Sequence, residues 1–207
     1  MNGNFTIIME RLDGSYGHYI QDKLQSITEG ADINAIEPDL ISGFVQILHM
    51  LRLLQHEFNF IHRDLHPDNI MLYKKSVKLL MEIEPGKKVI TYGKRLKIID
   101  LGLSCMKIDH ENIIQSADQD ECNNRGQDIM MFAGTIIQQY NDLLDNVPMY
   151  KQILYKSVKY LDINDSVSRE IPSTMVALRI NTPRSLVVPD KILHYIQKHY
   201  SQIFIID

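Results

Sequence analysis

Cysteine is scarce in this sequence: Cys105 and Cys122 are the only two among 207 residues. Neither belongs to a Cys-x-x-Cys motif, and no histidine lies at a metal-binding spacing from them. We therefore expect two reduced thiols in a reducing compartment, with a disulfide or a shared metal ion as the less favoured alternative.

Long apolar runs and an excess of basic residues are also missing. No window approaches the ~18 uninterrupted apolar residues of a membrane-spanning helix. The N-terminal residues lack the basic segment and apolar run of a signal peptide. The net charge of −4 argues against a nucleic-acid partner. We therefore expect an intracellular, cytoplasmic protein that has neither a membrane nor a nucleic-acid partner.

The pattern of apolar residues predicts an α+β fold that is mostly α. Three-to-four spacing predicts helices at residues 19–24, 38–58, 126–144, 150–161, 173–178 and 189–200. Short runs of β-forming residues predict strands at 5–9, 70–73, 77–83, 89–92 and 96–99. Polar residues predict loops at 28–37 and 109–125. The helix at 38–58 is apolar on several sides, so we expect it at the centre of the domain.

The segment at about 74–95 is expected to form a hairpin insertion. Glu84, Pro85, Gly86 and Lys87 have the composition of a tight turn between two strand-like runs. The segment lengthens the connection between two polar motifs, and we expect it to be a surface elaboration.

Two motifs carry residues suited to phosphoryl transfer. Residues 62–69 (HRDLHPDN) follow the long predicted helix, and residues 100–102 (DLG) follow a predicted strand. Phosphoryl transfer requires a carboxylate that accepts the proton of the attacking hydroxyl, and Asp64 suits that role. It also requires oxygen ligands for Mg²⁺, which Asn69 and Asp100 can provide.

These motifs resemble those of the eukaryotic-type protein kinase family. Residues 62–69 match the catalytic loop H-R-D-L-x-x-x-N at every fixed position, and residues 100–102 match D-F-G with Leu in place of Phe. The resemblance implies a kinase C-lobe, ATP and Mg²⁺ as cofactors, and a protein substrate. The implied catalytic residues are Arg63, Asp64 and His66, and the implied ligands of the metal and nucleotide are Asn69 and Asp100.

The resemblance extends on both sides of the two motifs. Residues 1–13 look like the last N-lobe strand and the hinge, which implies that Glu10 and Leu12 bind adenine through the backbone. Residues 14–207 would then be the C-lobe. Residues 126–130 resemble the start of the helix whose aspartate supports the catalytic loop, which implies that role for Asp128.

The sequence departs from the kinase pattern in three places. It contains no G-x-G-x-x-G loop and no V-A-I-K lysine, so most of the N-lobe is missing. Either another source supplies an N-lobe, or the chain is a truncated relative, or it does not use ATP. His66 replaces the usual lysine, which is similar to atypical kinases and to kinase-like proteins of large DNA viruses. No A-P-E motif follows residue 102.

We therefore predict a serine/threonine protein kinase, in a truncated or split form. Two alternatives remain open from the sequence. One is an inactive kinase-like module, or pseudokinase, that binds or scaffolds another protein. The other is an atypical kinase that phosphorylates small molecules, which His66 and the missing A-P-E motif favour.

Overall fold

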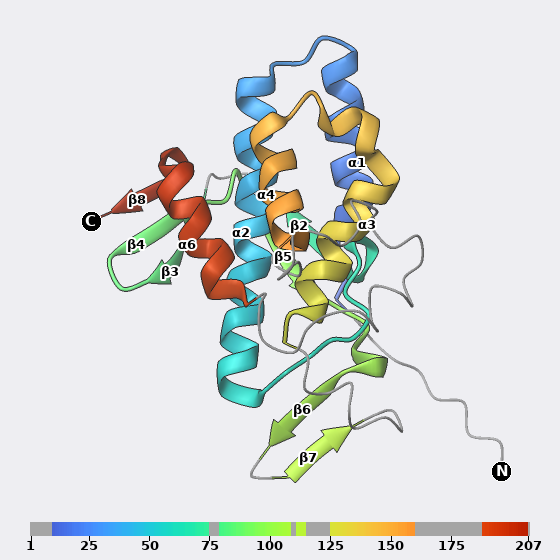
Figure 1. Cartoon of the computed structure of the whole chain (residues 1–207), viewed down its shortest axis with the longest axis vertical. Helices are drawn as coiled ribbons and strands as arrows, with labels where there is room; N and C mark the ends of the chain where they lie inside the picture. Colours follow the sequence, from blue (N-terminus) through green and yellow to red (C-terminus); the bar gives the residue numbers. More distant parts are fainter. Residues whose placement is uncertain (1–9, 75–78, 109–110, 115–124, 160–187, 207) are drawn as a thin grey trace, which may run out of the picture.

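The structure is a computed structural model, and it describes residues 10–74, 79–108, 111–114, 125–159 and 188–206. Within these residues the fold is mostly helical, with small antiparallel sheets at the side and at one end of the helices (Figure 1). The helices are α1 (Tyr16–Thr28), α2 (Ile33–Phe58), α3 (Gln127–Leu144), α4 (Pro148–Lys159) and α6 (Pro189–His199), with 3₁₀ turns η1 (Pro67–Asn69), η2 (Leu101–Leu103) and η4 (Ser201–Ile203). The strands are β1 (Gly14–Ser15), β2 (Ile70–Lys74), β3 (Leu80–Glu84), β4 (Lys87–Ile90), β5 (Lys94–Ile98), β6 (Cys105–Ile108), β7 (Glu111–Ile114) and β8 (Phe204–Ile206).

Helix α2 runs through the centre of the fold, as its many apolar residues predict. Nearly every side chain from Leu40 to Leu51 is buried. The helix begins at Ile33, so the prediction of a loop at 28–37 is wrong for its second half. Asp32 caps the helix by accepting a hydrogen bond from the backbone N–H of Asn34 at 2.9 Å. Pro38, which the sequence suggested as the first residue, lies inside the helix.

Helices α1, α3 and α4 pack along α2 and enclose an aromatic core. The ring of Phe132 on α3 stacks on Phe44 of α2 at 5.4 Å and on Tyr16 of α1 at 6.2 Å, measured between centroids. The N-terminus of α4 is held by Glu37, whose carboxylate accepts hydrogen bonds from the N–H groups of Met149 and Tyr150. These contacts bury the apolar faces that the helical spacing predicted.

The sheet β1-β2-β5 brings the two sequence motifs to one place. Strands β2 and β5 are antiparallel, and Ile70 pairs with Ile98. The residue before β2 is Asn69, and the residues after β5 are Ile99 and Asp100. Because the strands are antiparallel and in this register, both motifs lie at the same end of the sheet.

The predicted hairpin at 74–95 forms around the expected turn, with Glu84 paired to Lys87. It is not a surface elaboration, because the side chains of Ile83 and Val89 are buried in the core. Strand β4 also pairs with β8 near the C-terminal end, which the sequence did not predict. Arg52 of α2 fixes the hairpin, since its guanidinium donates to the carboxylate of Glu84 at 3.0 Å and to a backbone carbonyl of β3.

Strands β6 and β7 form a second hairpin that extends from the lower end of the molecule (Figure 1). Residues 111–114 were expected in a polar loop, so that prediction is wrong for this segment. Cys105 at the start of β6 is disulfide-bonded, contrary to the expected reduced thiol, and Cys122 lies outside the described residues. The strand predicted at 5–9 and the helix predicted at 173–178 also lie outside them. Among the described residues, no helix combines the length and apolar character needed to cross a lipid bilayer.

Candidate active site

The loop at 62–69 is anchored at its start by the end of α2 and by β6. Helix α2 ends at Phe58, and its C-cap residue Asn59 adopts a left-handed backbone conformation with φ 48°. Two residues later the backbone groups of Ile61 and Cys105 exchange hydrogen bonds of 2.9 and 2.8 Å. These contacts therefore fix the direction in which the chain enters the loop. They also fix the start of the loop relative to Cys105, which lies three residues after the second motif.

Asp128 supports the loop from the first turn of α3. Its carboxylate is fully buried and accepts hydrogen bonds from the backbone N–H groups of His62 and Arg63, each at 2.9 Å. Burial raises the pKa of the Asp128 carboxyl, and the hydrogen bonds from the two N–H groups partly oppose that rise. The predicted supporting role of Asp128 is thus confirmed by direct hydrogen bonds.

The side chain of His62 connects the two motifs. Its Nε2 lies 2.8 Å from the carbonyl oxygen of Ile99, the residue before Asp100. Its Nδ1 accepts a hydrogen bond of 3.3 Å from the backbone N–H of Asp64. With Nδ1 as the acceptor of that bond, Nε2 is the ring nitrogen that donates to Ile99. The sequence indicated His62 only as part of a motif, because its partner at position 99 is distant along the chain.

Asn69 holds the end of the loop against its middle. Its side-chain Nδ2 donates to the carbonyl oxygen of Asp64 at 2.8 Å, and its own carbonyl accepts from the N–H of Ile99 at 3.0 Å. Asn69 is buried, the side chain of Asp64 is half-buried, and Asp100 is exposed. The hydrogen bonds therefore gather the backbone at 64, 69 and 99, where two acidic side chains remain accessible to solvent.

The chemistry of these side chains suits Mg²⁺. With Nδ2 of Asn69 committed to Asp64, the Oδ1 atom is the one that this amide can offer to a cation. Together with the carboxylate of Asp100 it provides the hard oxygen donors that Mg²⁺ prefers. The part of the chain that the structure describes has no group of three or more His, Cys, Asp or Glu side chains that could hold a metal ion. Mg²⁺ at this place would therefore need phosphate oxygens and water as further ligands.

Arg63 and His66 have different surroundings. Arg63 is buried in a left-handed conformation with φ 68°, and its Nη1 donates to the carbonyl of Leu103 at 3.4 Å, beyond the second motif. His66 is half-buried, with its Nε2 4.0 Å from the nearer carboxylate oxygen of Asp64. Arg63 therefore braces the segment after Asp100, whereas His66 lies beside the proposed proton acceptor. Their catalytic roles stay predictions.

The predicted adenine-binding residues precede β1. Glu10 is exposed and forms an ion pair with Lys97 of β5, and Leu12 is half-buried. The N–H of Asp13 donates to the carbonyl of Leu72 in β2 at 2.9 Å. This segment thus runs beside the sheet that carries both motifs, and adenine binding by Glu10 and Leu12 stays a prediction.

Comparison with known proteins agrees with this geometry. The family described as Poxvirus serine/threonine protein kinase matches residues 43–165, more than half of the chain, and the match contains both motifs and Asp128. The chain is also 24% identical over 208 residues to "Probable kinase 098L" of Invertebrate iridescent virus 3. That alignment covers 98% of this chain and 38% of the relative, so the chain spans well under half of that protein's length. The resemblance to kinase-like proteins of large DNA viruses is confirmed, and the chain belongs to the poxvirus serine/threonine protein kinase family.

Proposed function

We propose that this chain carries the phosphoryl-transfer site of an ATP- and Mg²⁺-dependent kinase that acts on serine and threonine hydroxyls of proteins. The observation that carries the proposal is the hydrogen-bonded loop at 62–69. There Asp128 supports the loop's start, and Asn69 ties its end to Asp64 and Ile99. Phosphoryl transfer depends mainly on positioning and electrostatic stabilisation, and a loop held at several points meets that need.

Each residue has a distinct task in this proposal. Asp64 orients the attacking hydroxyl and accepts its proton, and His66 hydrogen-bonds the transferred phosphate. Asn69 and Asp100 hold Mg²⁺, which neutralises charge on the phosphates when it is bound. Backbone groups near Glu10 and Leu12 bind adenine. The described part then corresponds to a C-lobe, and the Gly-rich loop and lysine come from a separate chain or from another part of a longer protein.

A phosphorylation assay tests the proposal. The purified chain is incubated with Mg·ATP and a protein substrate, alone and with a fragment that supplies a Gly-rich loop and its lysine. Asp64→Asn removes the proton acceptor at nearly constant volume and is expected to reduce transfer by about 10²- to 10⁴-fold. Asp142→Asn, an equally conservative change at an exposed site on α3, serves as the matched control. Equal phosphate incorporation by both variants would contradict the assignment of Asp64.

The class of substrate is tested in the same assay. Label found on serine or threonine of the protein substrate supports the protein-kinase proposal. Label found only on an added hydroxylated small molecule would support the atypical alternative, in which His66 replaces the usual lysine.

One observation favours a second candidate, an inactive kinase-like module that binds another protein. Leu101 within the second motif and Leu103 directly after it are 43% and 38% exposed, so an apolar surface lies beside Asp100. A lobe or partner seated there would remove this surface from water. Calorimetric titration of the chain with Mg·ATP separates the two functions. A kinase site binds Mg·ATP weakly without its other lobe, and Asp100→Ala removes that binding. A pure binding module shows no effect of Asp100→Ala.

A further inference from the structure

The first turn of α1 lies unusually close to the turn η1 that carries Asn69. Ser15 is the N-cap of α1, and its Oγ accepts a hydrogen bond of 3.1 Å from the N–H of His18. The same hydroxyl donates to Oδ1 of Asp68 at 2.8 Å. One side chain therefore both caps the helix and binds the residue next to Asn69 in the loop.

Gly17 shows how close this approach is. A Cβ at this position would lie 2.4 Å from Oδ1 of Asp68 and 3.3 Å from Cβ of Pro67. Glycine weakens a helix relative to alanine, so its presence in the first turn of α1 has a local cost. The structure accounts for it, because η1 occupies the space that a side chain would need.

A third element reaches the same junction. Helix α3 departs from helical geometry at Tyr140, where φ is −130° and ψ is 20°. The hydroxyl of Tyr140 lies 3.5 Å from the carbonyl oxygen of Gly17, a long hydrogen bond. Elements far apart in the sequence thus fix the position of α1 relative to the loop.

We infer that the contact of Ser15 and Gly17 with Asp68, which we call the α1–η1 clamp, is a positioning device for Asn69. Asp68 precedes Asn69 within the same 3₁₀ turn, so the clamp fixes the turn from one side. The hydrogen bonds of Asn69 to Asp64 and Ile99 fix it from the other side. A divalent cation held by Asn69 would depend on both. This inference rests on the proposed function for its link to the metal, but the clamp itself is testable without any ligand.

Hydrogen exchange at the backbone amides of His66, Asp68, Asn69, Ile70 and Ile99 measures the clamp directly. Ser15→Asp is the informative variant, because aspartate also caps helices but cannot donate to Asp68 and repels its charge. We expect about fivefold to tenfold faster exchange at Asn69 and Ile99, the consequence of losing one hydrogen bond. Gly17→Ala should act in the same direction by displacing Asp68, and Ser15→Thr should restore the exchange rates of the unchanged chain.

The matched control is Asp32→Ala. Asp32 caps α2 in the same manner, just beyond the far end of α1 and about 20 Å along that helix from the clamp. It should lower overall stability without a selective effect on residues 66–70. If Ser15→Asp and Gly17→Ala change exchange at Asn69 no more than Asp32→Ala does, the inference is wrong.

Binding of Mn²⁺ in the presence of ATP, followed by electron paramagnetic resonance, tests the link to the metal. We expect Asn69→Ala to abolish binding and Ser15→Asp to weaken it about fivefold or more. Loss in Asn69→Ala with unchanged affinity in Ser15→Asp would overturn the positioning role. If Asn69→Ala leaves Mn²⁺ binding intact, the metal role of Asn69 in the proposed function is refuted. The exchange experiment then tests on its own whether the α1–η1 clamp positions Asn69.

Discussion

Replacing Asp128 tests how much of the protein's stability depends on the hydrogen bonds that this residue accepts from the 62–69 loop. The carboxylate is fully buried and accepts two backbone hydrogen bonds of 2.9 Å. Asp128→Ala leaves two buried N–H groups, of His62 and Arg63, without an acceptor. Each costs about 1–3 kcal/mol, so the variant should lose roughly 2–6 kcal/mol of unfolding free energy. Against a typical total of about 5–15 kcal/mol, this is a large loss.

Asp128→Asn separates the geometry from the charge. The amide keeps one acceptor oxygen and places an NH₂ group against the second N–H, so about half of the loss is expected, roughly 1–3 kcal/mol. Because the folded-state pKa of Asp128 is raised above its ordinary 3.8, the folded state binds its proton more tightly than the unfolded state. The stability of the unchanged chain relative to Asp128→Asn should therefore fall as pH rises from 3.8 through the raised pKa, and should be constant above it.

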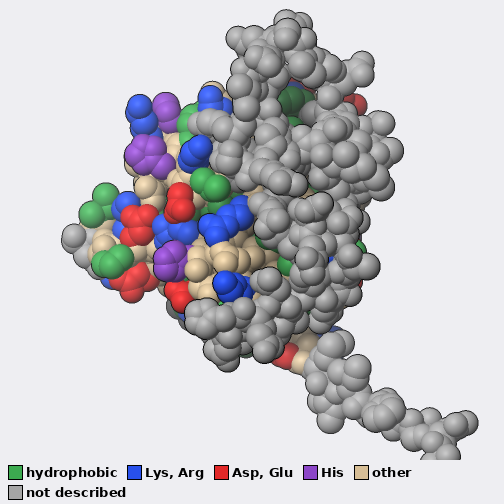
Figure 2. All heavy atoms as spheres, turned by 60° about the horizontal axis from the view of Figure 1, so that its bottom comes forward, with side chains coloured by type: hydrophobic (Ala, Val, Ile, Leu, Met, Phe, Trp, Pro, Cys, Tyr) green, Lys and Arg blue, Asp and Glu red, His purple; other side chains and the backbone are tan. Residues whose placement is uncertain are grey.

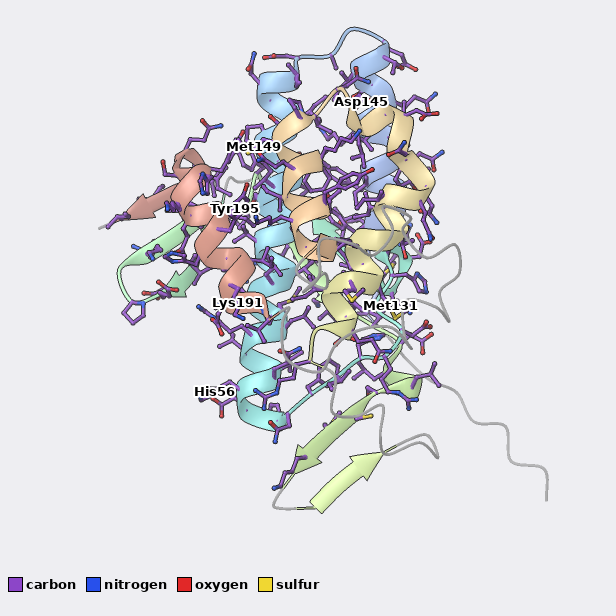
Figure 3. The ribbon with its side chains drawn as sticks, in the orientation of Figure 1. His56, Met131, Asp145, Met149, Lys191 and Tyr195 are labelled. Atoms are coloured by element: carbon purple, nitrogen blue, oxygen red, sulfur yellow. The ribbon has the colours of Figure 1, made fainter. Side chains whose placement is uncertain are left out.

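Urea unfolding of the chain, monitored by circular dichroism, gives these free energies. Asp145→Ala is the matched control, since Asp145 is an exposed carboxylate at the end of the same helix, in an ion pair with Lys151 at 2.6 Å (Figure 3). Exposed ion pairs contribute at most about 1 kcal/mol. If Asp128→Ala is as stable as Asp145→Ala, the two hydrogen bonds do not hold the loop and the reasoning fails.

Three further outcomes follow from buried contacts. Gly43→Ala should destabilise the fold by about 1–3 kcal/mol, because a Cβ at position 43 would lie 2.0 Å from the hydroxyl of Tyr16. This loss outweighs the better helix propensity of alanine, and thermal unfolding measures it. Glu37→Ala should cost about 1–2 kcal/mol, since it leaves the N-terminus of α4 uncapped, whereas Glu37→Gln should cost less in the same measurement. The pKa of His49 is lowered from 6.5 by burial and then by the charge of Arg52, so the unfolded state binds the proton more tightly. Stability should rise with pH from the lowered pKa up to 6.5 and be constant above it, and His49→Gln should remove this slope in urea titrations between pH 5 and 8.

Figure 2 views the molecule with the lower end of Figure 1 turned forward, and basic, acidic and histidine side chains are interspersed on its coloured surface. Charges of both signs on this described surface agree with the modest net charge of −4. The charge pattern on this face therefore adds nothing to the choice of substrate, which depends on the loop chemistry.

The helices could be predicted because each has an apolar face with helical spacing, and α2 was recognisable as buried for the same reason. Their ends were harder to place: α2 begins after the cap Asp32, five residues before the proline that suggested its start. Strand β7 was missed because charged and polar residues precede and begin it, and propensity favours a loop there. Strand β8 was missed because its partner β4 is more than a hundred residues away. Pairings of this kind depend on tertiary packing, which local patterns do not encode.

In the candidate site, too, local features could be predicted from the sequence and long-range contacts could not. The motifs singled out Asp64, Asn69 and Asp100 as candidates, because the spacing within a short motif is visible in the sequence. The contacts that hold these residues were not visible, since His62 bonds the carbonyl of Ile99 and the clamp joins α1 to η1. The sequence alone does not explain why residue 17 is glycine, because the reason is the close approach of η1.

The two motifs carry a conformational cost that explains why so many contacts converge on them. Arg63 and Asp100 both have positive φ, at 68° and 57°, a region that costs non-glycine residues about 1–2 kcal/mol each. Such conformations persist only where the surroundings fix them. Arg63 is fixed by the hydrogen bond from its N–H to Asp128 and by a 3.4 Å bond from Gln127 to its carbonyl. Asp100 is fixed by the His62 and Asn69 bonds to the preceding Ile99. A loop whose only task was to connect α2 with β2 would not need a strained Arg63 and buried polar partners from α3. The arrangement is the one expected when side chains must be presented at fixed positions to a ligand, and replacing Arg63 or Asp100 by glycine should relieve the strain yet loosen that presentation.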